Sequence, residues 1–287
     1  MDRHAGHEPG SPVDCPPVRP AILPRYHGDF LAWTGGAALI GEGSGAIALH
    51  SHYAIQLSLG SPSGLRVRFG RAGEWQSCAA ALVPSRAVHS IDVNECDWSS
   101  VLFIEPETAA GRAIAARLQG RLEVLPQPRI APFVQRLERA WRLERRPDAV
   151  QAVYQGLLRE LSGAEQREAS DPRVRAAVDH IGRHVDQPLT LPQVAAVAHL
   201  SPSRFRHLFV QETGMPLRTY LLWRRLLHVW TLLVQGESLA AAAHAAGFAD
   251  SAHLSRTSRT MFGLAPSALQ MTGPLSVGAR LRKPHFA

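Results

Sequence analysis

Three histidines and one glutamine in the first third of the chain are the residues best suited to bind a ligand. His50 and His52 are two positions apart, Gln56 follows soon after, and His89 ends the run PSRAVH. Residues two apart on a strand share a face, so we expect His50 and His52 to converge on one point. Imidazole binds zinc, iron, nickel or copper readily, whereas an amide is a poor replacement for a carboxylate ligand. His50, His52 and His89 are therefore candidate metal ligands, and the same three with Gln56 form a candidate effector-binding set.

These four residues allow three interpretations, which the sequence leaves open. They bind a divalent metal ion, they line a polar pocket for a small organic effector, or they form a structural cluster. The chain has 14 histidines, so some close pairs arise by chance. No nucleophile with a neighbouring base is visible, so we expect no catalytic residues and no enzyme.

A second group of polar residues belongs to a motif that occurs twice, at 189–214 and at 237–263. Each copy has a short alanine-rich helix, a short turn, and a second helix that begins at a capping residue and carries basic side chains. This layout is typical of proteins that place two helices in DNA grooves.

In the first copy, Thr190 begins the shorter helix with Gln193 as its capping-box partner. Ser201, followed by proline, begins the longer one. A long apolar helix is predicted over 217–234, and it holds the two copies at a fixed spacing. In the second copy, Asp250 or Ser251 caps the longer helix.

The stretch 172–270 resembles the DNA-binding half of the AraC/XylS family of bacterial transcription regulators. The matching positions are Ser201, Phe205, Phe209, Gly214, Tyr220 and Arg224, then Gly247, Phe248, Asp250, Ser251, Leu254, Ser255, Arg256, Phe262, Gly263 and Pro266. The resemblance implies that two recognition helices enter adjacent major-groove segments on one face of the duplex.

Carried over position by position, the resemblance places base contacts on Ser203, Arg206, His207, Ser251, Ala252, Ser255 and Arg256. We add Thr190 as a phosphate contact at a helix N-terminus, and Ser201, Arg204 and Arg259 as further DNA-binding residues. Arg224 and Arg225, on the long helix, are expected to form ion pairs or backbone contacts instead.

Three positions depart from the family pattern. Ser258 stands where a buried phenylalanine is usual, and Trp230 stands where a small alanine is usual, so the two changes compensate in volume or leave the second copy loosely packed. His207 replaces a common arginine and lacks the guanidinium fork that pairs with guanine. We expect the first copy to anchor sequence preference and the second to add affinity with less discrimination.

The same family commonly joins a cupin-like β-barrel to this DNA-binding half. The histidine set resembles the cupin pattern H-x-H…E and P-x-G-x-x-H, with Gln56 at the glutamate position and Arg86 at the glycine position. Short apolar or alternating runs over 26–105, separated by Gly, Pro, Ser and Asp clusters, predict a small antiparallel barrel or sandwich.

Helical periodicity follows over 108–162, where one helix over 108–122 and two more are predicted. Their apolar positions are Phe133, Leu137, Trp141, Val153, Leu157, Leu158 and Leu161. These residues either cover the open barrel or form a dimer interface, and the resemblance favours the dimer.

Charge separates the two halves of the chain. From residue 171 onward there are 13 basic and 6 acidic residues, against 18 of each before it, so the whole net charge of +7 lies in the C-terminal part. A neutral module joined to a basic one is expected when only one of them meets a polyphosphate. The three cysteines show no metal spacing and suit a reducing cytosol, and no apolar run is long enough to cross a membrane.

The sequence therefore predicts an α+β multidomain protein with an N-terminal cupin-like β-barrel and an all-α double helix-turn-helix domain. The expected segments are a disordered arm (1–24), the barrel sensor (25–107), a helical dimerisation or cover segment (108–162), a linker (163–171), the DNA-binding domain (172–270) and a flexible basic tail (271–287).

The predicted function is that of an effector-responsive, sequence-specific transcription regulator in the cytoplasm. Its expected partners are double-stranded DNA, a second copy of the chain, a small-molecule effector or divalent metal ion and, if it activates, RNA polymerase. The sequence leaves activation or repression open. The competing predictions are a metal-dependent cupin enzyme with a nucleic-acid-binding appendage, and a protein that coats DNA without sequence preference.

Overall fold

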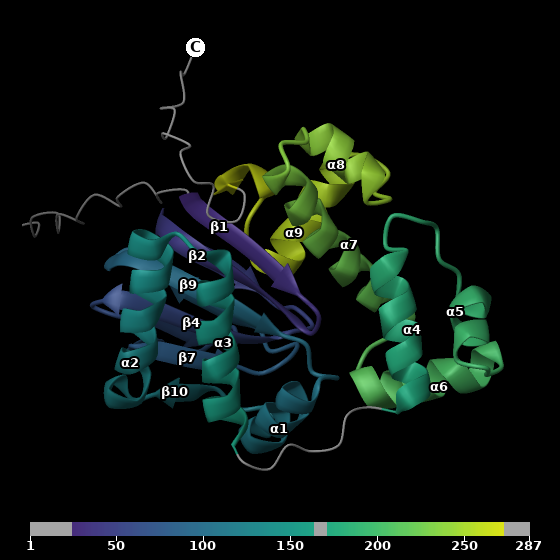
Figure 1. Ribbon diagram of the computed structural model, residues 1–287, viewed down its shortest axis with the longest axis horizontal. Coiled ribbons are helices and arrows are strands. Elements are labelled where there is room, and N and C mark those ends of the chain that lie inside the picture. Colours follow the sequence, from purple (N-terminus) through teal and green to yellow (C-terminus); the bar gives the residue numbers. More distant parts are fainter. Residues whose placement is uncertain (1–24, 164–170, 273–287) are drawn as a thin grey trace, which may run out of the picture.

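The computed structural model describes residues 25–163 and 171–272. Figure 1 shows a β-rich half (25–163) covered by helices on one side, and a helical half (171–272) on the other. The predicted arm, most of the predicted linker, and the tail after residue 272 lie outside the described residues. Within the described part of the chain, no helix is both long and apolar enough to cross a membrane.

The β-rich half consists of two sheets. One has seven strands in the order β10-β7-β4-β9-β2-β1-β11, and the other has four in the order β3-β8-β5-β6. The strands are β1 (Arg25–Trp33), β2 (Gly36–Ser44), β3 (Ala46–His50), β4 (Ile55–Pro62), β5 (Leu65–Phe69), β6 (Trp75–Cys78), β7 (Ala80–Val83), β8 (His89–Asp92), β9 (Cys96–Ile104), β10 (Glu123–Leu125) and β11 (Leu269–Thr272).

The seven-stranded sheet is buried on both faces, which explains its nearly continuous apolar runs. Along β9, Leu102 and Ile104 face one side and pack with the helices that follow in sequence. Val101 and Phe103 face the other side and pack with the helical half. The alternation of side chains along one strand therefore supplies two separate cores.

The predicted barrel is not closed. Among the described residues, the two sheets form an open sandwich, with a small core between them that includes Val67, Val83 and Ile91. The helical half packs against the part of the large sheet that the small sheet leaves uncovered. The closure predicted by the cupin resemblance is wrong because the second core of the large sheet is completed by helices and not by further strands.

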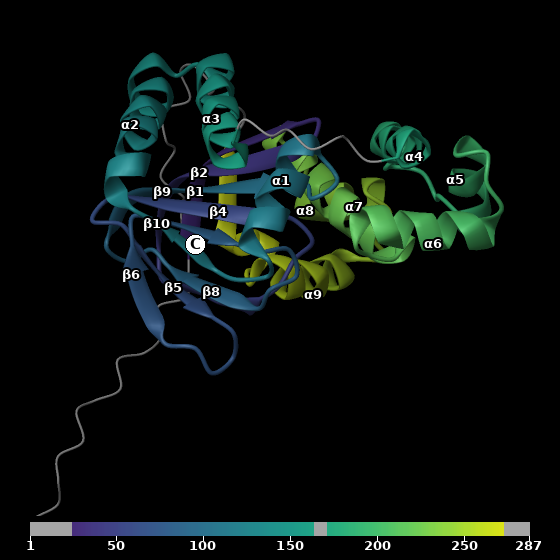
Figure 2. The same ribbon diagram turned by 90° about the horizontal axis from the view of Figure 1, so that it is seen from below.

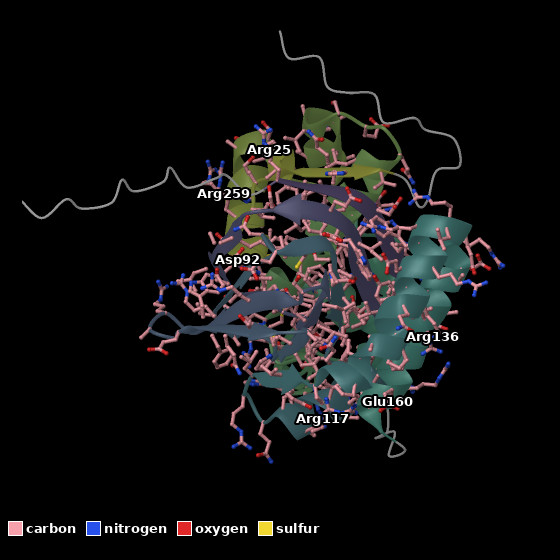
Figure 3. All side chains as sticks on the ribbon, turned by 90° about the vertical axis from the view of Figure 1, so that its left-hand side faces the viewer. Arg25, Asp92, Arg117, Arg136, Glu160 and Arg259 are labelled. Atoms are coloured by element: carbon pink, nitrogen blue, oxygen red, sulfur yellow. The ribbon has the colours of Figure 1, made fainter. Side chains whose placement is uncertain are left out.

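Helices α1 (Ala109–Leu118), α2 (Gln127–Glu138), η1 (Arg139–Glu144) and α3 (Pro147–Ser162) cover the outer face of the large sheet. Leu137, Trp141, Leu157 and Leu161 are buried there, whereas Phe133, Val153 and Leu158 are partly buried. Charged side chains such as Arg136 and Glu160 point outward from this layer (Figure 3). Most of the apolar residues that the sequence assigned to either a barrel cover or a dimer interface therefore cover the sheet.

The first predicted helix of this layer is too long. It begins after the N-cap Thr108 and ends at Leu118, because Gln119 and Gly120 both adopt the left-handed conformation, with φ of 49° and 77°. Glu123–Leu125 then forms β10, which pairs with β7 at the sheet edge. A three-residue strand has too little periodicity to be seen in the sequence.

The helical half contains α4 (Pro172–Arg183), α5 (Leu191–Val197), α6 (Pro202–Thr213), α7 (Leu217–Val234), α8 (Leu239–Ala245), α9 (Ser251–Phe262) and the short 3-10 helix η2 (Pro266–Ala268). We call α5 with α6 the first unit and α8 with α9 the second unit. Thr190 forms the predicted capping box with Gln193, whose Oε1 accepts from the Thr190 backbone N–H at 2.8 Å. Asp250, and not Ser251, caps α9.

The chain returns to the large sheet after the second unit. Strand β11 pairs in parallel with β1, with Tyr26 opposite Leu269 and His27 opposite Gln270. The sequence predicts no strand at Leu269 and Gln270, which it assigns to the end of the DNA-binding segment. A four-residue parallel edge strand depends on a partner far away in the chain, so it leaves no local signal. Figure 2 shows the result: α9 lies against the strands, whereas α5 and α6 extend away from them.

Candidate nucleic-acid interface and effector chamber

Helix α6 presents the polar face that the sequence predicts for the first unit. Ser203, Arg204, Arg206 and His207 are exposed. On the opposite face Phe205 and Phe209 are fully buried and their rings lie 5.2 Å apart. Ser201 caps the helix by accepting the Arg204 backbone N–H. The recognition helix of this unit is therefore anchored by apolar contacts and open to solvent along its predicted DNA face.

Helix α9 has the same organisation. Ser251, Ala252, Arg256 and Arg259 are exposed, and Ser255 is half-buried. Figure 3 shows Arg259 at the surface of the molecule. The cap is strong, since Asp250 Oδ1 accepts the His253 backbone N–H at 2.6 Å. Both predicted contact sets lie on exposed helix faces.

The two unusual residues of the second unit are accommodated without loose packing. Ser258 is fully buried and donates its hydroxyl to the backbone oxygen of Leu264 at 2.7 Å. Trp230 is 1% exposed and its ring contacts Phe262 edge-on, with centroids 6.2 Å apart. Trp230 of α7 thus packs against Phe262, which lies one helical turn after Ser258 on α9, and both unusual positions are filled without exposure.

Arg224 and Arg225 have the structural roles predicted for them. Arg225 donates to the backbone oxygens of Gly247 and Gln187, so it connects the second unit to the loop before the first. Arg224 donates to Glu105 Oε1 at 2.5 Å across the boundary between the two halves. Neither guanidinium lies on a recognition helix.

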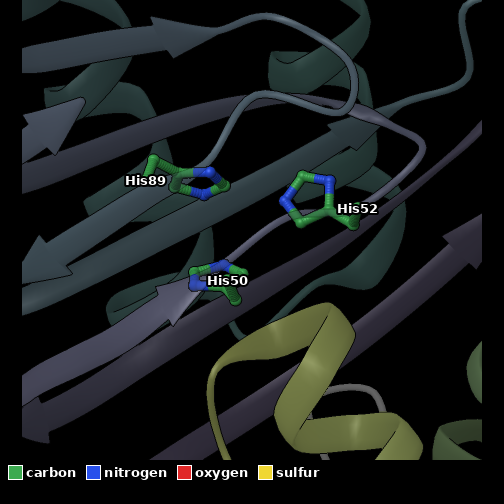
Figure 4. A group of neighbouring side chains, drawn as sticks. All are labelled: His50, His52 and His89. Carbon is green, nitrogen blue, oxygen red and sulfur yellow. The ribbon is translucent and has the colours of Figure 1, made fainter. Parts of the chain in front are cut away.

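The four candidate ligand-binding residues lie together. We call His50, His52, Gln56 and His89 the histidine chamber. All four are buried, with exposed fractions between 0% and 6%. The ring centroids of His50 and His89 are 4.2 Å apart, and His52 lies 5.6 and 5.2 Å from them (Figure 4). The ligand atoms of the three histidines lie within 4.8 Å of one another.

The histidines converge for a different reason than the one predicted. His50 ends β3, whereas His52 lies in the loop before β4, so the two do not share a strand face. The loop turns His52 back toward Gln56 on β4, and Arg86 donates its backbone N–H to the His52 oxygen at 2.7 Å. Arg86 has a φ of 62°, which suits the glycine position that it occupies in the cupin pattern.

Backbone carbonyls orient all three rings. The Nδ1 atoms of His50, His52 and His89 lie 2.8 to 2.9 Å from the oxygens of Ala48, Ala54 and Ala87. A carbonyl oxygen only accepts hydrogen bonds, so each Nδ1 carries the proton. Burial lowers the pKa of His52 to about 3 and that of His89 to about 4, and burial with the neighbouring imidazoles lowers the pKa of His50. The rings are therefore neutral near pH 7, with their Nε2 lone pairs free to accept.

Gln56 faces two of these lone pairs. Its terminal amide lies 2.7 Å from His52 Nε2 and 3.3 Å from His89 Nε2, and its other end lies 2.8 Å from Ser58 Oγ. An amide oxygen cannot bond to two acceptor nitrogens, and the two ends of an amide are interchangeable by a half turn. With the NH2 group toward the histidines, Gln56 donates to both rings and its oxygen accepts from Ser58.

The chamber is shared by both halves of the protein. A cavity of about 30 Å³ is lined by His50, Gln56 and Phe103 from the strands and by Phe262, Leu264 and Leu269 from the helical half. This volume is about that of one water molecule. The ring of Phe262 lies 5.2 Å from Phe103 and 6.4 Å from His52. The end of recognition helix α9 therefore forms one wall of the chamber, a contact that no local sequence pattern indicates.

The boundary near the first unit is polar instead. Glu107 accepts from Tyr53 at 2.5 Å and from Tyr220 of α7 at 3.0 Å, beside the Arg224–Glu105 pair. Burial raises the pKa of Glu105 to about 7, although Arg224 lowers it. We call these five residues the polar clamp. Neither glutamate belongs to a sequence motif, so the sequence alone did not indicate their role.

One further ion pair and a cleft complete this side. Arg112 of α1 pairs with Glu212 of α6 at 2.5 Å, and Glu212 also accepts the Asp171 backbone N–H. Next to the clamp, a cleft of about 640 Å³ separates the β1–β2 turn from α4 and α7. Its lining includes Trp33, Thr34, Asp179, Arg183 and Arg224. Helix α6 of the first unit thus meets the β-rich half through an ion pair, beside the clamp of α7 and an open cleft.

Comparison with known proteins identifies the helical half. A helix-turn-helix domain family matches residues 194–271. Among solved structures, an apo variant of ToxT from Vibrio cholerae strain SCE256 is 11% identical, with a TM-score of 0.55 over 81% of this chain and 96% of ToxT. Wild-type ToxT from the same strain, bound to an unsaturated fatty acid, is 12% identical, with a TM-score of 0.51 over 87% of this chain and 96% of ToxT.

These findings confirm two predictions from the sequence. The domain match confirms a helix-turn-helix domain at the C-terminal end. The similarity to ToxT confirms a β-rich half joined to a helical half.

Proposed function

We propose that this DNA-binding transcription regulator is controlled by what occupies its histidine chamber. The predicted DNA contacts on α6 and α9 are part of the proposal. So is the assignment of His50, His52, Gln56 and His89 as the effector site. The effector acts by changing how the second unit is presented to DNA.

The observation that carries this proposal is the position of α9. Phe262, the last residue of the helix, packs against Phe103 of the large sheet and Trp223 of α7, with centroids 5.2 and 5.6 Å away. The backbone N–H of Ser51, between two chamber histidines, faces the Thr260 oxygen at 3.4 Å. A change in the chamber therefore acts directly on the end of a recognition helix, through contacts that already exist.

The fold of ToxT is one in which an unsaturated fatty acid has been bound. A fatty acid does not fit the histidine chamber of the present chain, because a cavity of about 30 Å³ does not admit a long aliphatic chain. An effector at the chamber must be very small, or it must displace Phe262 and Leu264. Polar nitrogen atoms at the chamber also favour a polar ligand.

Two C-cap glycines provide a matched test. Gly214 ends α6 and Gly263 ends α9, both in the left-handed conformation, with φ of 81° and 70°. A methyl group on Gly263 would lie 2.5 Å from the Ala48 oxygen and 2.8 Å from His50 Nδ1, whereas on Gly214 its nearest neighbour is Arg86 at 3.9 Å. Alanine thus introduces similar backbone strain at both positions and a clash with β3 at only one.

Genomic footprinting first defines the binding site, and full-length variants are then compared on DNA that contains one or both contacted segments. We expect Gly263→Ala to change the affinity ratio between two-segment and one-segment DNA by about tenfold, equivalent to about 1.4 kcal/mol. Gly214→Ala should leave the ratio near the wild-type value. Equal ratios in both variants would contradict control through the α9–β3 contact.

We extend the proposal to the remaining partners. A homodimer would form through the α2–α3 layer, where Leu143 is 78% exposed at the end of η1, and sedimentation of Leu143→Glu tests it. Contact with RNA polymerase is proposed if the protein activates, and transcription in vitro tests that. A role on DNA supports a cytoplasmic location, which we include in the proposal. We assign it a binding role and no catalytic one.

A further inference from the structure

The three histidines of the chamber differ from an ordinary buried cluster in the direction of their lone pairs. Each Nδ1–H donates to the backbone oxygen of an alanine two residues away: Ala48 for His50, Ala54 for His52 and Ala87 for His89. This arrangement fixes one tautomer and aims the unprotonated nitrogen inward. Metal-binding histidines are oriented in the same way, by a hydrogen bond from the nitrogen that does not bind the metal.

The spacing of the three rings, with one ligand nitrogen taken from each, fits a metal ion. Three atoms within 4.8 Å of one another leave a central point at most about 2.8 Å from each, and zinc–imidazole bonds are about 2.0–2.1 Å long. Each ring therefore has to move by less than about 1 Å to close on an ion. Within the described part of the chain, His50 Nε2 has no hydrogen-bond partner, and the adjacent cavity has room for a water molecule as a fourth ligand.

We propose that His50, His52 and His89 bind a transition metal ion through their Nε2 atoms, and that this ion is the effector of the chamber. Neutral imidazole ligands select zinc, nickel, cobalt or copper over magnesium and calcium, which prefer carboxylates. The identification of the ion as the effector rests on the proposed function, whereas the binding site itself does not.

Gln56 makes the site reversible. Without metal, its NH2 group donates to His52 and His89 and so satisfies two of the three lone pairs. Binding an ion requires the amide to turn, which places its oxygen toward the metal and its NH2 group toward Ser58 Oγ. Because the amide adds no negative charge, a divalent ion is bound less tightly than with a carboxylate at the same position. Such a site gains and loses its ion with changes in concentration.

Closing on an ion moves the two rings that touch the helical half. Gly263 lies directly against His50, and the ring of Phe262 faces that of His52 with an interplanar angle of 36°. Trp223 of α7 lies 5.7 Å from the His52 ring. The shift of under about 1 Å required for coordination therefore reaches α9 and α7 without an intervening layer.

The binding site is tested on the full-length protein after treatment with a chelator. Cobalt is titrated and followed by its visible d–d absorption, and zinc affinity is measured by competition with a chromogenic chelator. We expect one ion per chain. His50→Ala and His89→Ala should each lose about 100-fold or more in affinity. The matched control is His180→Ala, because His180 and His184 form a pair on α4 with centroids 4.2 Å apart.

Gln56→Glu keeps the test decisive if the alanine variants fail to fold. A carboxylate in place of the amide should tighten zinc binding about tenfold or more. Absence of stoichiometric binding to the wild type would overturn the proposal. Loss of the ion in His180→Ala but not in His89→Ala would also overturn it, as would weaker binding by folded Gln56→Glu.

A separate measurement distinguishes the site from its role. DNA affinity is compared with and without zinc for the wild type and for Gln56→Glu. A change in the wild type, at lower zinc concentration in Gln56→Glu, supports the metal as effector. Tight zinc binding with unchanged DNA affinity would retain the metal site and reject control of DNA binding by the chamber.

Discussion

The two helix-turn-helix units have nearly the same local structure but different attachments to the rest of the protein. The first unit contacts the β-rich half through the Arg112–Glu212 pair, and the polar clamp of α7 lies beside it, next to a cleft of about 640 Å³. The second places Phe262 directly against Phe103 of the large sheet and continues into strand β11. A partly exposed ion pair such as Arg112–Glu212 separates at little cost, whereas an apolar ring contact and a strand pairing do not. We therefore expect the second unit to move with the β-rich half and the first unit to be held less tightly by it.

The largest expected effect concerns the two aromatic anchors. Phe262→Ala and Phe205→Ala should each cost about 3–5 kcal/mol of unfolding free energy, because both side chains are buried. The elements that lose protection against hydrogen exchange should differ between the two variants. Hydrogen exchange should accelerate in β1, β3 and β9 for Phe262→Ala, and only in α4–α6 for Phe205→Ala. The same exchange pattern in both variants would show that the two units are attached alike.

The polar clamp makes a prediction about pH. The pKa of Glu105 is raised from 4.5 to about 7 in the folded protein, so the folded state holds a proton that the unfolded state releases between these values. The unfolding free energy of the wild type, relative to Glu105→Gln, should therefore fall as pH rises from about 4.5 to about 7, and stay level above. The drop is roughly 3 kcal/mol.

Urea unfolding of the wild type and of Glu105→Gln across this pH range measures the difference between their unfolding free energies. The contributions of the histidines are the same in both proteins and cancel in that difference. Glu105→Gln leaves the apolar contacts of the second unit intact. A difference that rose with pH would mean that Arg224 dominates over burial, and the clamp would then resemble a strong ion pair.

The recognition helices should differ in discrimination. Arg206 and Arg256 are both exposed, and neither forms an ion pair within the described residues. Replacing either with alanine should cost about 1–3 kcal/mol in DNA binding. We expect the loss of base preference to be larger for Arg206→Ala, measured as the affinity ratio between operator and competitor DNA. A larger loss for Arg256→Ala would reverse the ranking of the two units.

The smallest effect is expected at the caps of the two shorter helices. Thr190 caps α5 and Ser238 caps α8, where its Oγ accepts the Ala241 N–H at 3.2 Å. Alanine should cost about 1 kcal/mol of stability at each position. Only Thr190→Ala should also weaken DNA binding, if Thr190 contacts a phosphate as proposed. Thermal unfolding and filter binding separate the two quantities, and equal DNA affinity in both variants would remove Thr190 from the interface.

Local patterns in the sequence were sufficient for the helical half. Capping residues such as Ser201 and the left-handed position at Gly214 act within one turn, so the helices of both units, and the exposed faces that carry Arg206 and Arg256, follow from short stretches of chain. The apolar period also predicted α7 over its full length. The histidine set was found from residue type and spacing, although its convergence depends on a loop and not on a strand face.

Tertiary structure alone decided how the halves join. The pairing of β11 with β1 connects positions more than two hundred residues apart, and Phe262 completes a chamber whose other walls are Phe103 and His50. Such contacts depend on how apolar faces are shared out once the chain collapses, and an apolar residue has the same appearance in the sequence whichever core it enters. The sequence therefore determined two DNA-binding units and a set of histidines, and only the packing of one unit against those histidines showed which unit they can control.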